Sequence, residues 1–411
     1  MKKVLFVTYG GGHVNIVIPI AKEIEKYNDI EFSIVAFTTA IPVLEVSGLK
    51  FKTLIDYLPF FKDSKKIIDI GDSLAPKYHN PEAGFSIEET SAYLGCSMYD
   101  LIQKIGEKDA LTKFYTEGRK AFCPTSIMQQ ILKIEQPDIL VTTVPYRMEK
   151  AAVIEAKNLG IKTVFIHDLH FVKQNNLYDI IDIHCVMNKF VKEQLISYGI
   201  GENKIFITGQ PAFDYLLNPI NRSKNDIYKE FGLLLHKKTI IWIADNSKVL
   251  TKTYFNEIAK VINEFKEYQF IIKMHPGEEN IDIFEKICEE SNNNNAILIH
   301  RCNNKELIYI GDLFLVGLST MGLEISRMNK NIINLDYDNL WENREGNELK
   351  YFRYDICGLA LLVNEIDKLK YQINRCFYDK EVQNSLKNNR EKFYFNITKA
   401  SVKIINLLSK V

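Results

Sequence analysis

Apolar residues in this chain alternate between short β-branched runs and longer stretches with helical spacing. Val4–Thr8 is the first such run, and it is followed by three glycines and then by Ile16–Tyr27, where apolar residues recur every three or four positions. This order predicts a strand, a tight turn and a helix, which is the opening unit of a doubly wound parallel sheet. We therefore expect an α/β protein.

The same unit recurs through the first half of the chain, with one interruption. The alternation of strand and helix patterns is interrupted at about 54–111, where aromatic residues, lysines and short helical stretches are mixed. We expect an insertion there, on the acceptor side of the first domain. The Asn-, Pro-, Ser- and Lys-rich stretch Leu217–Lys224 indicates a linker. Strands are predicted at Glu31–Phe37, Asp138–Thr142, Thr163–Ile166, Ile183–Met187 and Ile205–Thr208, and helices at Ile127–Ile134, Glu149–Leu159 and Lys189–Tyr198.

The second half restarts the alternation, which predicts a second parallel sheet. Two such halves joined by a linker imply two Rossmann-like domains facing a cleft. We expect an N-terminal domain at 1–216, a C-terminal domain at 217–380, and a long helix at 381–411 that crosses back to the first domain. Strands are predicted at Thr239–Ile243, Phe270–Met274, Ile297–His300, Leu313–Val316 and Asn331–Leu335, and helices at Tyr254–Phe265, Ile281–Glu290 and Gly322–Met328.

Length and composition narrow the class of protein. The 411 residues suit two domains better than one core. Lys plus Arg equals Asp plus Glu at 52 each, and this balance argues against nucleic acid as the main partner. The apolar run at the N-terminus is too short for a signal peptide, and no stretch is long enough to span a membrane. The seven scattered cysteines indicate reduced thiols, so we expect a cytoplasmic protein, with peripheral contact at the inner face of the membrane left open.

A glycine-rich turn carries the first candidate chemistry. Gly11, Gly12 and His13 follow the first strand, at the edge where a parallel sheet places its ligands. Glycines allow close approach of the backbone, and the N–H groups of the following helix favour an anion. The plainer alternative is a tight turn with a surface histidine.

This turn resembles a known family. Phe6–Asn15, together with Pro19–Glu23, resembles the opening of GT-B glycosyltransferases, in which a glycine-rich turn with histidine precedes a similar helix. The resemblance implies that His13 removes the proton from an acceptor hydroxyl. An imidazole suits that task because its unperturbed pKa lies near neutral pH.

A second resemblance lies at the end of the first half. Lys204–Asp214 is similar to the strand and turn that close the first domain in UDP-GlcNAc 2-epimerases and in peptidoglycan and galactolipid glycosyltransferases. This implies that Gly209 and Gln210 lie close to the donor.

Two further segments resemble donor-binding motifs. Ile272–Pro276 is similar to the His-Pro motif of CDP-glycerol glycerophosphotransferases and of bacterial sialyl- and Kdo-transferases, and Asp312–Glu324 to the donor loop of GT-B enzymes. The resemblance implies hydroxyl contacts to the donor phosphate and a carboxylate on the ribose, although an ordinary helix cap has the same residue types. The expected donor-binding residues are Gly209, Gln210, Asn246, Ser247, Lys273, His275, Pro276, Ser319, Thr320 and Glu324.

The chain also departs from these families. Val141–Pro145 and His167–Phe171 stand where nonhydrolysing 2-epimerases carry Gly-Asp-Thr and His-Val-Glu-Ala-Gly, so the acids of that elimination chemistry are missing. Ala244–Ser247 replaces a Gly-Gly-Ser donor loop. The first departure favours transfer over epimerisation, and the His-Pro motif leaves UDP-, CMP- and CDP-linked donors open.

The cluster of His167, Asp168 and His170 has two interpretations. Two histidines and an aspartate could hold zinc or manganese. GT-B transfer needs no metal, however, so we expect no metal and no cofactor, and we place the three residues with Arg147 along the cleft. Asp168 is the second candidate for the catalytic base.

Together these features predict a metal-independent glycosyltransferase of the GT-B type. It would move a sugar from a nucleotide-activated donor to a glycan or lipid-linked acceptor in cell-envelope or polysaccharide assembly. The alternatives are an isomerase or hydrolase of the UDP-GlcNAc 2-epimerase type and a non-catalytic nucleotide-sugar binding protein. The sequence leaves open the sugar, the acceptor, the linkage, inversion or retention, and the oligomeric state.

Overall fold

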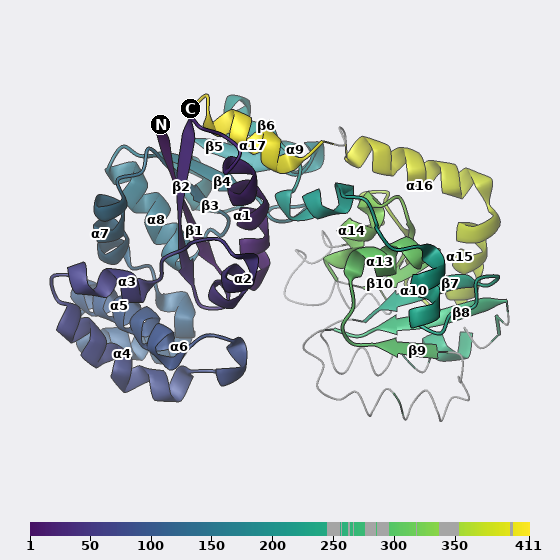
Figure 1. The fold of residues 1–411 in the computed structure, drawn as a ribbon, viewed down its shortest axis with the longest axis horizontal. Coiled ribbons are helices and arrows are strands. Elements are labelled where there is room, and N and C mark those ends of the chain that lie inside the picture. The colour runs from purple at the N-terminus through teal and green to yellow at the C-terminus, as the bar shows by residue number, and fades with distance from the viewer. Residues whose placement is uncertain are drawn as a thin grey trace. The chain divides into compact units, whose positions relative to one another are not determined.

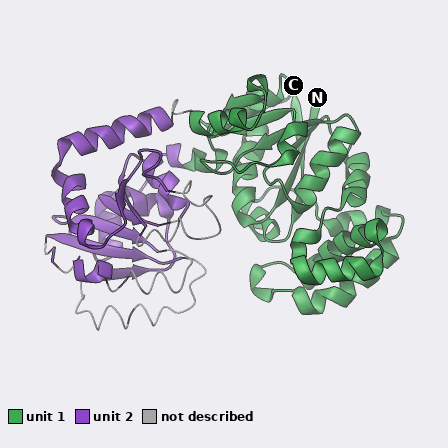
Figure 2. Ribbon diagram, turned by 180° about the vertical axis from the view of Figure 1, so that it is seen from behind, with its two compact units in different colours: residues 1–215, 397–411 green, residues 216–396 purple. Residues whose placement is uncertain are grey.

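The computed structural model divides the chain into two compact units. Unit 1 comprises residues 1–215 and 397–411, and unit 2 comprises residues 216–396 (Figure 2). The predicted boundary at 216/217 lies one residue from the first of these divisions, whereas the predicted boundary at 380/381 lies sixteen residues before the second. The structure describes residues 1–244, 255, 257–261, 264–265, 267–275, 285, 296–317, 319–336, 353–394 and 398–411.

Unit 1 contains a six-stranded parallel sheet in the order β2-β1-β3-β4-β5-β6. The chain first adds β2 on one side of β1 and then crosses over to add the other four strands on the opposite side. The strand order therefore reverses between β1 and β3, and ligands of such sheets bind beyond the carboxyl ends of the strands at this switch point. The strands are β1 (Lys2–Tyr9), β2 (Ile30–Phe37), β3 (Ile139–Thr142), β4 (Lys162–Ile166), β5 (Ile183–Val186) and β6 (Ile205–Ile207), and all six were predicted.

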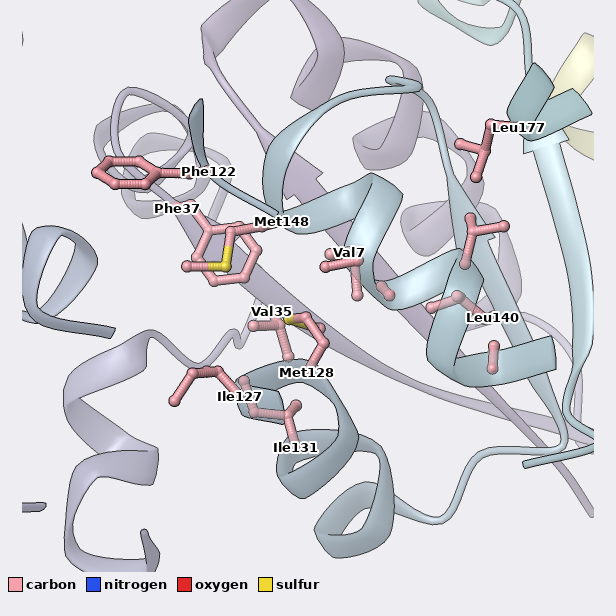
Figure 3. Close-up of a cluster of buried hydrophobic side chains, with 14 of the residues drawn as sticks. Val7, Val35, Phe37, Phe122, Ile127, Met128, Ile131, Leu140, Met148 and Leu177 are labelled. Atoms are coloured by element: carbon pink, nitrogen blue, oxygen red, sulfur yellow. The ribbon is translucent and has the colours of Figure 1, made fainter. Parts of the chain in front are cut away.

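Helices cover both faces of this sheet because its strands are apolar on both sides. One face packs against α1 (Gly11–Ile24), α2 (Ala40–Ser47) and α17 (Ala400–Leu408). The other packs against α7 (Thr125–Glu135) and α8 (Arg147–Asn158), and Figure 3 shows how Met128 and Met148 from these two helices meet strand residues of the core.

The predicted insertion is a group of helices attached to the second face. Gly71 in one helix and Gly95 in the next lie at a close crossing, because a Cβ on Gly95 would stand 2.2 Å from the Ile67 carbonyl oxygen. The group comprises α3 (Leu54–Tyr57), α4 (Ser64–Tyr78), α5 (Ile87–Ile105) and α6 (Glu107–Glu117).

Unit 2 contains a second six-stranded parallel sheet, in the order β12-β11-β10-β7-β8-β9. Its switch point lies between β7 and β10. The sequence pattern predicted every strand except β12, which has only three residues. The strands are β7 (Lys238–Ile243), β8 (Tyr268–Lys273), β9 (Ala296–Ile299), β10 (Leu313–Val316), β11 (Asn331–Leu335) and β12 (Leu361–Val363), with α10 (Lys224–Glu230), α13 (Asn304–Ile310), α14 (Met321–Arg327) and α15 (Asp367–Tyr378) among the helices.

The C-terminal segment differs from the single long helix that the sequence suggested. It forms α16 (Lys380–Phe393) in unit 2 and the separate helix α17 in unit 1. The α17 helix lies beside α1, and its first two backbone N–H groups donate to the buried Asp214 carboxylate at 2.7 and 2.9 Å (Figure 1). A polar cap thus fixes the start of this returning helix. Most of the predicted helices 254–265 and 281–290 lie outside the described residues.

Candidate active site

The two predicted catalytic residues meet at the carboxyl edge of the first sheet. His13 is on the first turn of α1, directly after β1, and Asp168 follows β4. Their side chains approach to 3.9 Å between His13 Nδ1 and Asp168 Oδ2, and both side chains retain access to solvent, at 30% and 40% exposure. The pair lies at the end of the sheet where the fold places ligands.

The surroundings tune both groups of this pair. Burial lowers the pKa of the His13 imidazole, and the nearby Asp168 carboxylate partly opposes this shift. Burial likewise raises the pKa of Asp168, against the opposing influence of His13. The imidazole is therefore neutral near pH 7, which is the state in which it can accept a proton.

The glycines before His13 have different roles from one another. Gly10 has φ +91°, a backbone conformation that favours glycine and turns the chain from β1 into α1. Gly11 donates its N–H to Thr39 Oγ1 at 3.0 Å, so that group is already paired within the protein. Gly12 is exposed, and a Cβ there would meet nothing within 4 Å.

A buried glutamate that the sequence did not single out ties this edge together. Glu149 on α8 is fully buried, and its carboxylate accepts the N–H groups of Tyr9 at 3.0 Å, Thr143 at 2.5 Å and Val144 at 2.7 Å. It thereby joins the ends of β1 and β3 across the switch point. Burial raises the pKa of Glu149 to about 8, although these hydrogen bonds act in the opposite direction. A glutamate at the start of a predicted helix was the only sequence signal.

Arg147 lies at the same edge in an unusual backbone conformation. It is the first residue of α8, is half-buried and has φ +55°, which is uncommon for a residue other than glycine. Its guanidinium stacks over the Tyr9 ring at 4.9 Å from the ring centroid. The sequence analysis placed Arg147 along the cleft with His167, Asp168 and His170, and the structure places it against Tyr9, the last residue of β1.

Gln210 was predicted to contact the donor, but its amide has another role in the structure. The side chain is buried, and Nε2 donates to the carbonyl oxygens of His167 at 3.2 Å and Asp168 at 2.8 Å. It therefore holds the backbone turn that presents the Asp168 carboxylate. Gly209 has φ +88°, and a Cβ there would stand 3.3 Å from the Cβ of Ala400 on α17. Both residues belong to unit 1, and the turn serves the packing of that unit.

His167 and His170 do not line an open surface as the sequence suggested. His167 is 3% exposed, and its Nε2 lies 3.0 Å from Nδ1 of His184 on β5. Burial lowers the pKa of His167 well below its ordinary value and that of His184 to about 4, so both rings are neutral. His170 is completely buried, with its ring edge against Phe171. Phe171 and Val172, which follow His170, are buried as well.

The donor-binding prediction in unit 2 falls on that sheet's own switch point. Ser319 and Thr320 lie between β10 and α14, and Glu324 is in the first turn of α14, where its side chain is partly exposed. The Ser319 carbonyl accepts the Tyr354 hydroxyl at 2.6 Å, and Gly322 leaves room for the Tyr354 ring, since a Cβ there would lie 2.3 Å from it. The loop is thus held in place while Thr320 remains exposed.

The His-Pro segment is described only in part. His275 follows β8 and is partly buried. Lys273 is buried, and its ammonium group donates to the carbonyl oxygens of Met274 and His300, both at 2.9 Å. We therefore revise its role from donor contact to a structural link between the ends of β8 and β9. Asn246, Ser247 and Pro276 lie outside the described residues.

Comparison with known proteins adds to this geometry. The sequence profile described as monogalactosyldiacylglycerol (MGDG) synthase matches residues 83–212, which include Arg147, Asp168 and Gln210. The processive diacylglycerol beta-glucosyltransferase of Bacillus licheniformis is 28% identical over 155 residues, or 36% of this chain. The match spans 37% of that relative's length.

Solved structures resemble the whole chain. UDP-GlcNAc 2-epimerase from Neisseria meningitidis bound to UDP-GlcNAc aligns over 100% of both chains with a TM-score of 0.62 and 17% identity. MurG from Acinetobacter baumannii aligns over 100% of both chains with a TM-score of 0.60 and 11% identity. These likenesses show the fold: two Rossmann-like domains, the GT-B class that the sequence predicted. In the described part of the chain, no helix is both long and apolar enough to cross a membrane.

Proposed function

We propose that this chain transfers a sugar from a nucleotide-activated donor to a hydroxyl group of a lipid-linked or glycan acceptor. The observation that carries the proposal is the pair of His13 and Asp168, 3.9 Å apart at the carboxyl edge of the first sheet. The match to the MGDG synthase profile and the glucosyltransferase relative support transfer as the reaction and a lipid as one class of acceptor.

The pair can perform the proton transfer that this reaction needs. In the proposed step, His13 Nε2 accepts the proton of the acceptor hydroxyl while that oxygen forms a bond to the anomeric carbon. The bond from the anomeric carbon to the donor phosphate breaks, and the nucleotide phosphate leaves. Asp168 stabilises the imidazolium that forms, and its distance from Nδ1 is expected to shorten when substrate is bound, as catalytic hydrogen bonds often do.

Unit 2 is the proposed donor domain. Ser319 and Thr320 would contact the departing phosphate, Glu324 the ribose, and His275 a phosphate oxygen. This assignment rests on the position of the β10–α14 loop at the switch point of the second sheet.

Nucleotide binding is the first test. Thermal-shift measurements with UDP, CDP, CMP and GDP should show a rise in melting temperature for the nucleotide that the folded protein binds. Release of that nucleotide from its sugar conjugate should then require an acceptor such as diacylglycerol. Conversion of UDP-GlcNAc without any acceptor would instead indicate the epimerase-type alternative, and binding without turnover would indicate a non-catalytic protein.

Variants of the pair test the mechanism. His13→Ala should lower kcat by about 10²–10⁴-fold with little change in nucleotide affinity, as expected for loss of a positioned base. His236→Ala, an exposed histidine in unit 2, is the matched control and should retain full activity. Because Asp168 raises the pKa of His13, Asp168→Asn should shift the acid limb of the kcat/KM profile to lower pH. Full turnover by the His13 variant would refute the catalytic assignment.

A further inference from the structure

The proposed acceptor edge carries a cation whose charge the fold leaves uncompensated. Arg147 is half-buried and stacked on Tyr9, and among the described residues no carboxylate lies within ion-pair distance of its guanidinium. The adjacent Glu149 carboxylate is occupied by backbone N–H groups. Half-buried arginines in folded proteins normally pair with an anion, because desolvating a charge costs free energy that only a partner offsets.

The position of this guanidinium is fixed by several contacts. The Tyr9 ring beneath it is itself packed on Tyr93 of α5, at 5.6 Å between centroids, and the Arg119 guanidinium lies 5.5 Å from the centroid of the Tyr93 ring. Guanidinium groups stacked on aromatic faces keep their planar N–H donors free for a second partner. The φ of +55° at Arg147 is a backbone conformation that costs free energy in a residue other than glycine.

We infer that Arg147 binds an anionic group of the acceptor, of the phosphate or carboxylate class. This inference rests on the proposed function, because it takes the edge beside His13 as the acceptor site. Tyr9 and His13 flank the same glycine turn, so an acceptor held by Arg147 would lie at the turn that presents the base. The arginine fork matches the planar pair of oxygens that phosphates and carboxylates offer. The enzyme would then prefer anionic acceptors over neutral ones of the same shape.

A matched pair of probes tests this preference. Octyl glucoside and octyl glucoside 6-phosphate share an alkyl chain and free sugar hydroxyls and differ in one phosphate. Their binding to the full chain is measured by calorimetry below the micelle concentration, with inorganic phosphate as a competitor. The phosphorylated probe should bind at least about tenfold more tightly, the gain expected from charge-assisted hydrogen bonds. If inorganic phosphate binds at this site while the two octyl probes bind equally, the site takes free phosphate, and the acceptor assignment is overturned.

Three variants separate the guanidinium from general charge and from folding. Arg147→Met should abolish the preference, whereas Lys150→Met, which removes a half-buried positive charge one turn further along α8, should retain it. Arg147→Gly relieves the positive φ, so it should melt no lower than Arg147→Met and yet lack the preference. An equal loss in the Arg147 and Lys150 variants would show only general electrostatics and would overturn the inference.

The same samples distinguish this inference from the proposed function. UDP and the other nucleotides are titrated into wild type and Arg147→Met. If nucleotide binds and the two octyl probes bind equally, the inference alone fails. If no nucleotide binds, the proposed function fails, and with it the identification of the anion as an acceptor group. A loss of nucleotide affinity in Arg147→Met would assign the guanidinium to the donor phosphate and would likewise overturn the inference.

Discussion

Replacing Glu149 by glutamine tests how the switch point of the first sheet is held together. One carboxylate oxygen accepts the Tyr9 N–H, and the other accepts those of Thr143 and Val144. A glutamine has one acceptor oxygen, and its NH2 group must face an N–H on the other side. The less costly orientation keeps the oxygen on the side of Thr143 and Val144, because two N–H groups donate there. The Tyr9 N–H then loses its partner, which costs about 1–3 kcal/mol for a buried unsatisfied donor.

Hydrogen exchange measures this loss locally. If the Tyr9 amide exchanges by local opening, 1–3 kcal/mol corresponds to roughly 5–150-fold faster exchange. Glu155→Gln is the matched control, since this buried glutamate is on the same helix but accepts one bond, from Gln129 at 3.1 Å.

The pH dependence provides an independent check on Glu149. Its pKa is raised from 4.5 to about 8 in the folded protein, so between these values the folded state binds more protons than the unfolded state. The contribution of the protonated Glu149 carboxyl to the free energy of unfolding is therefore complete below about pH 4.5 and is lost as the pH rises toward 8. The stability difference between wild type and the glutamine variant should be largest near pH 5 and shrink toward pH 8. Unchanged Tyr9 exchange, or a difference that grows with pH, would refute the reasoning.

Three other expectations follow from single contacts. Asp214→Asn should destabilise the docking of α17 by about 1 kcal/mol, measured as faster hydrogen exchange in residues 400–408, because one of the two carboxylate oxygens that accept the first N–H groups of the helix is replaced by an NH2 group. Gly95→Ala should lower the melting temperature, because its Cβ would stand 2.2 Å from the Ile67 carbonyl, and a wild-type melting curve would contradict the tight crossing. His184→Gln should reduce the loss of stability on acidification and leave the part that His167 contributes: the pKa values of His184 and His167 lie below 6.5 when folded, so the stability that the two rings contribute is complete above 6.5 and falls as the pH drops toward 4. An unchanged acid profile would contradict it.

The sequence by itself determined the two-sheet architecture. Strands that are buried on both faces consist of continuous apolar runs, and in helices the apolar residues recur every three to four positions. Both signals are local, so they can be recognised in the sequence without knowledge of the fold. The glycine turn with His13 and the loop with Ser319 could be placed for the same reason, because each directly follows a strand. Among the described residues, β12, the break between α16 and α17, and the helices α2, α10, α13 and α15 were not predicted from the sequence.

The partners of each side chain were decided by tertiary structure alone. Gln210 was assigned to the donor from its motif, but it reaches across β5 to carbonyls that follow β4. Glu149 looked like an ordinary helix residue, and yet it joins two strands that are far apart in sequence. Lys273 was assigned to the donor from its motif, and instead links two backbone carbonyls. Sequence periodicity fixes which face of an element is buried, whereas hydrogen-bond partners depend on strand order and on distances between segments that only the folded chain brings together.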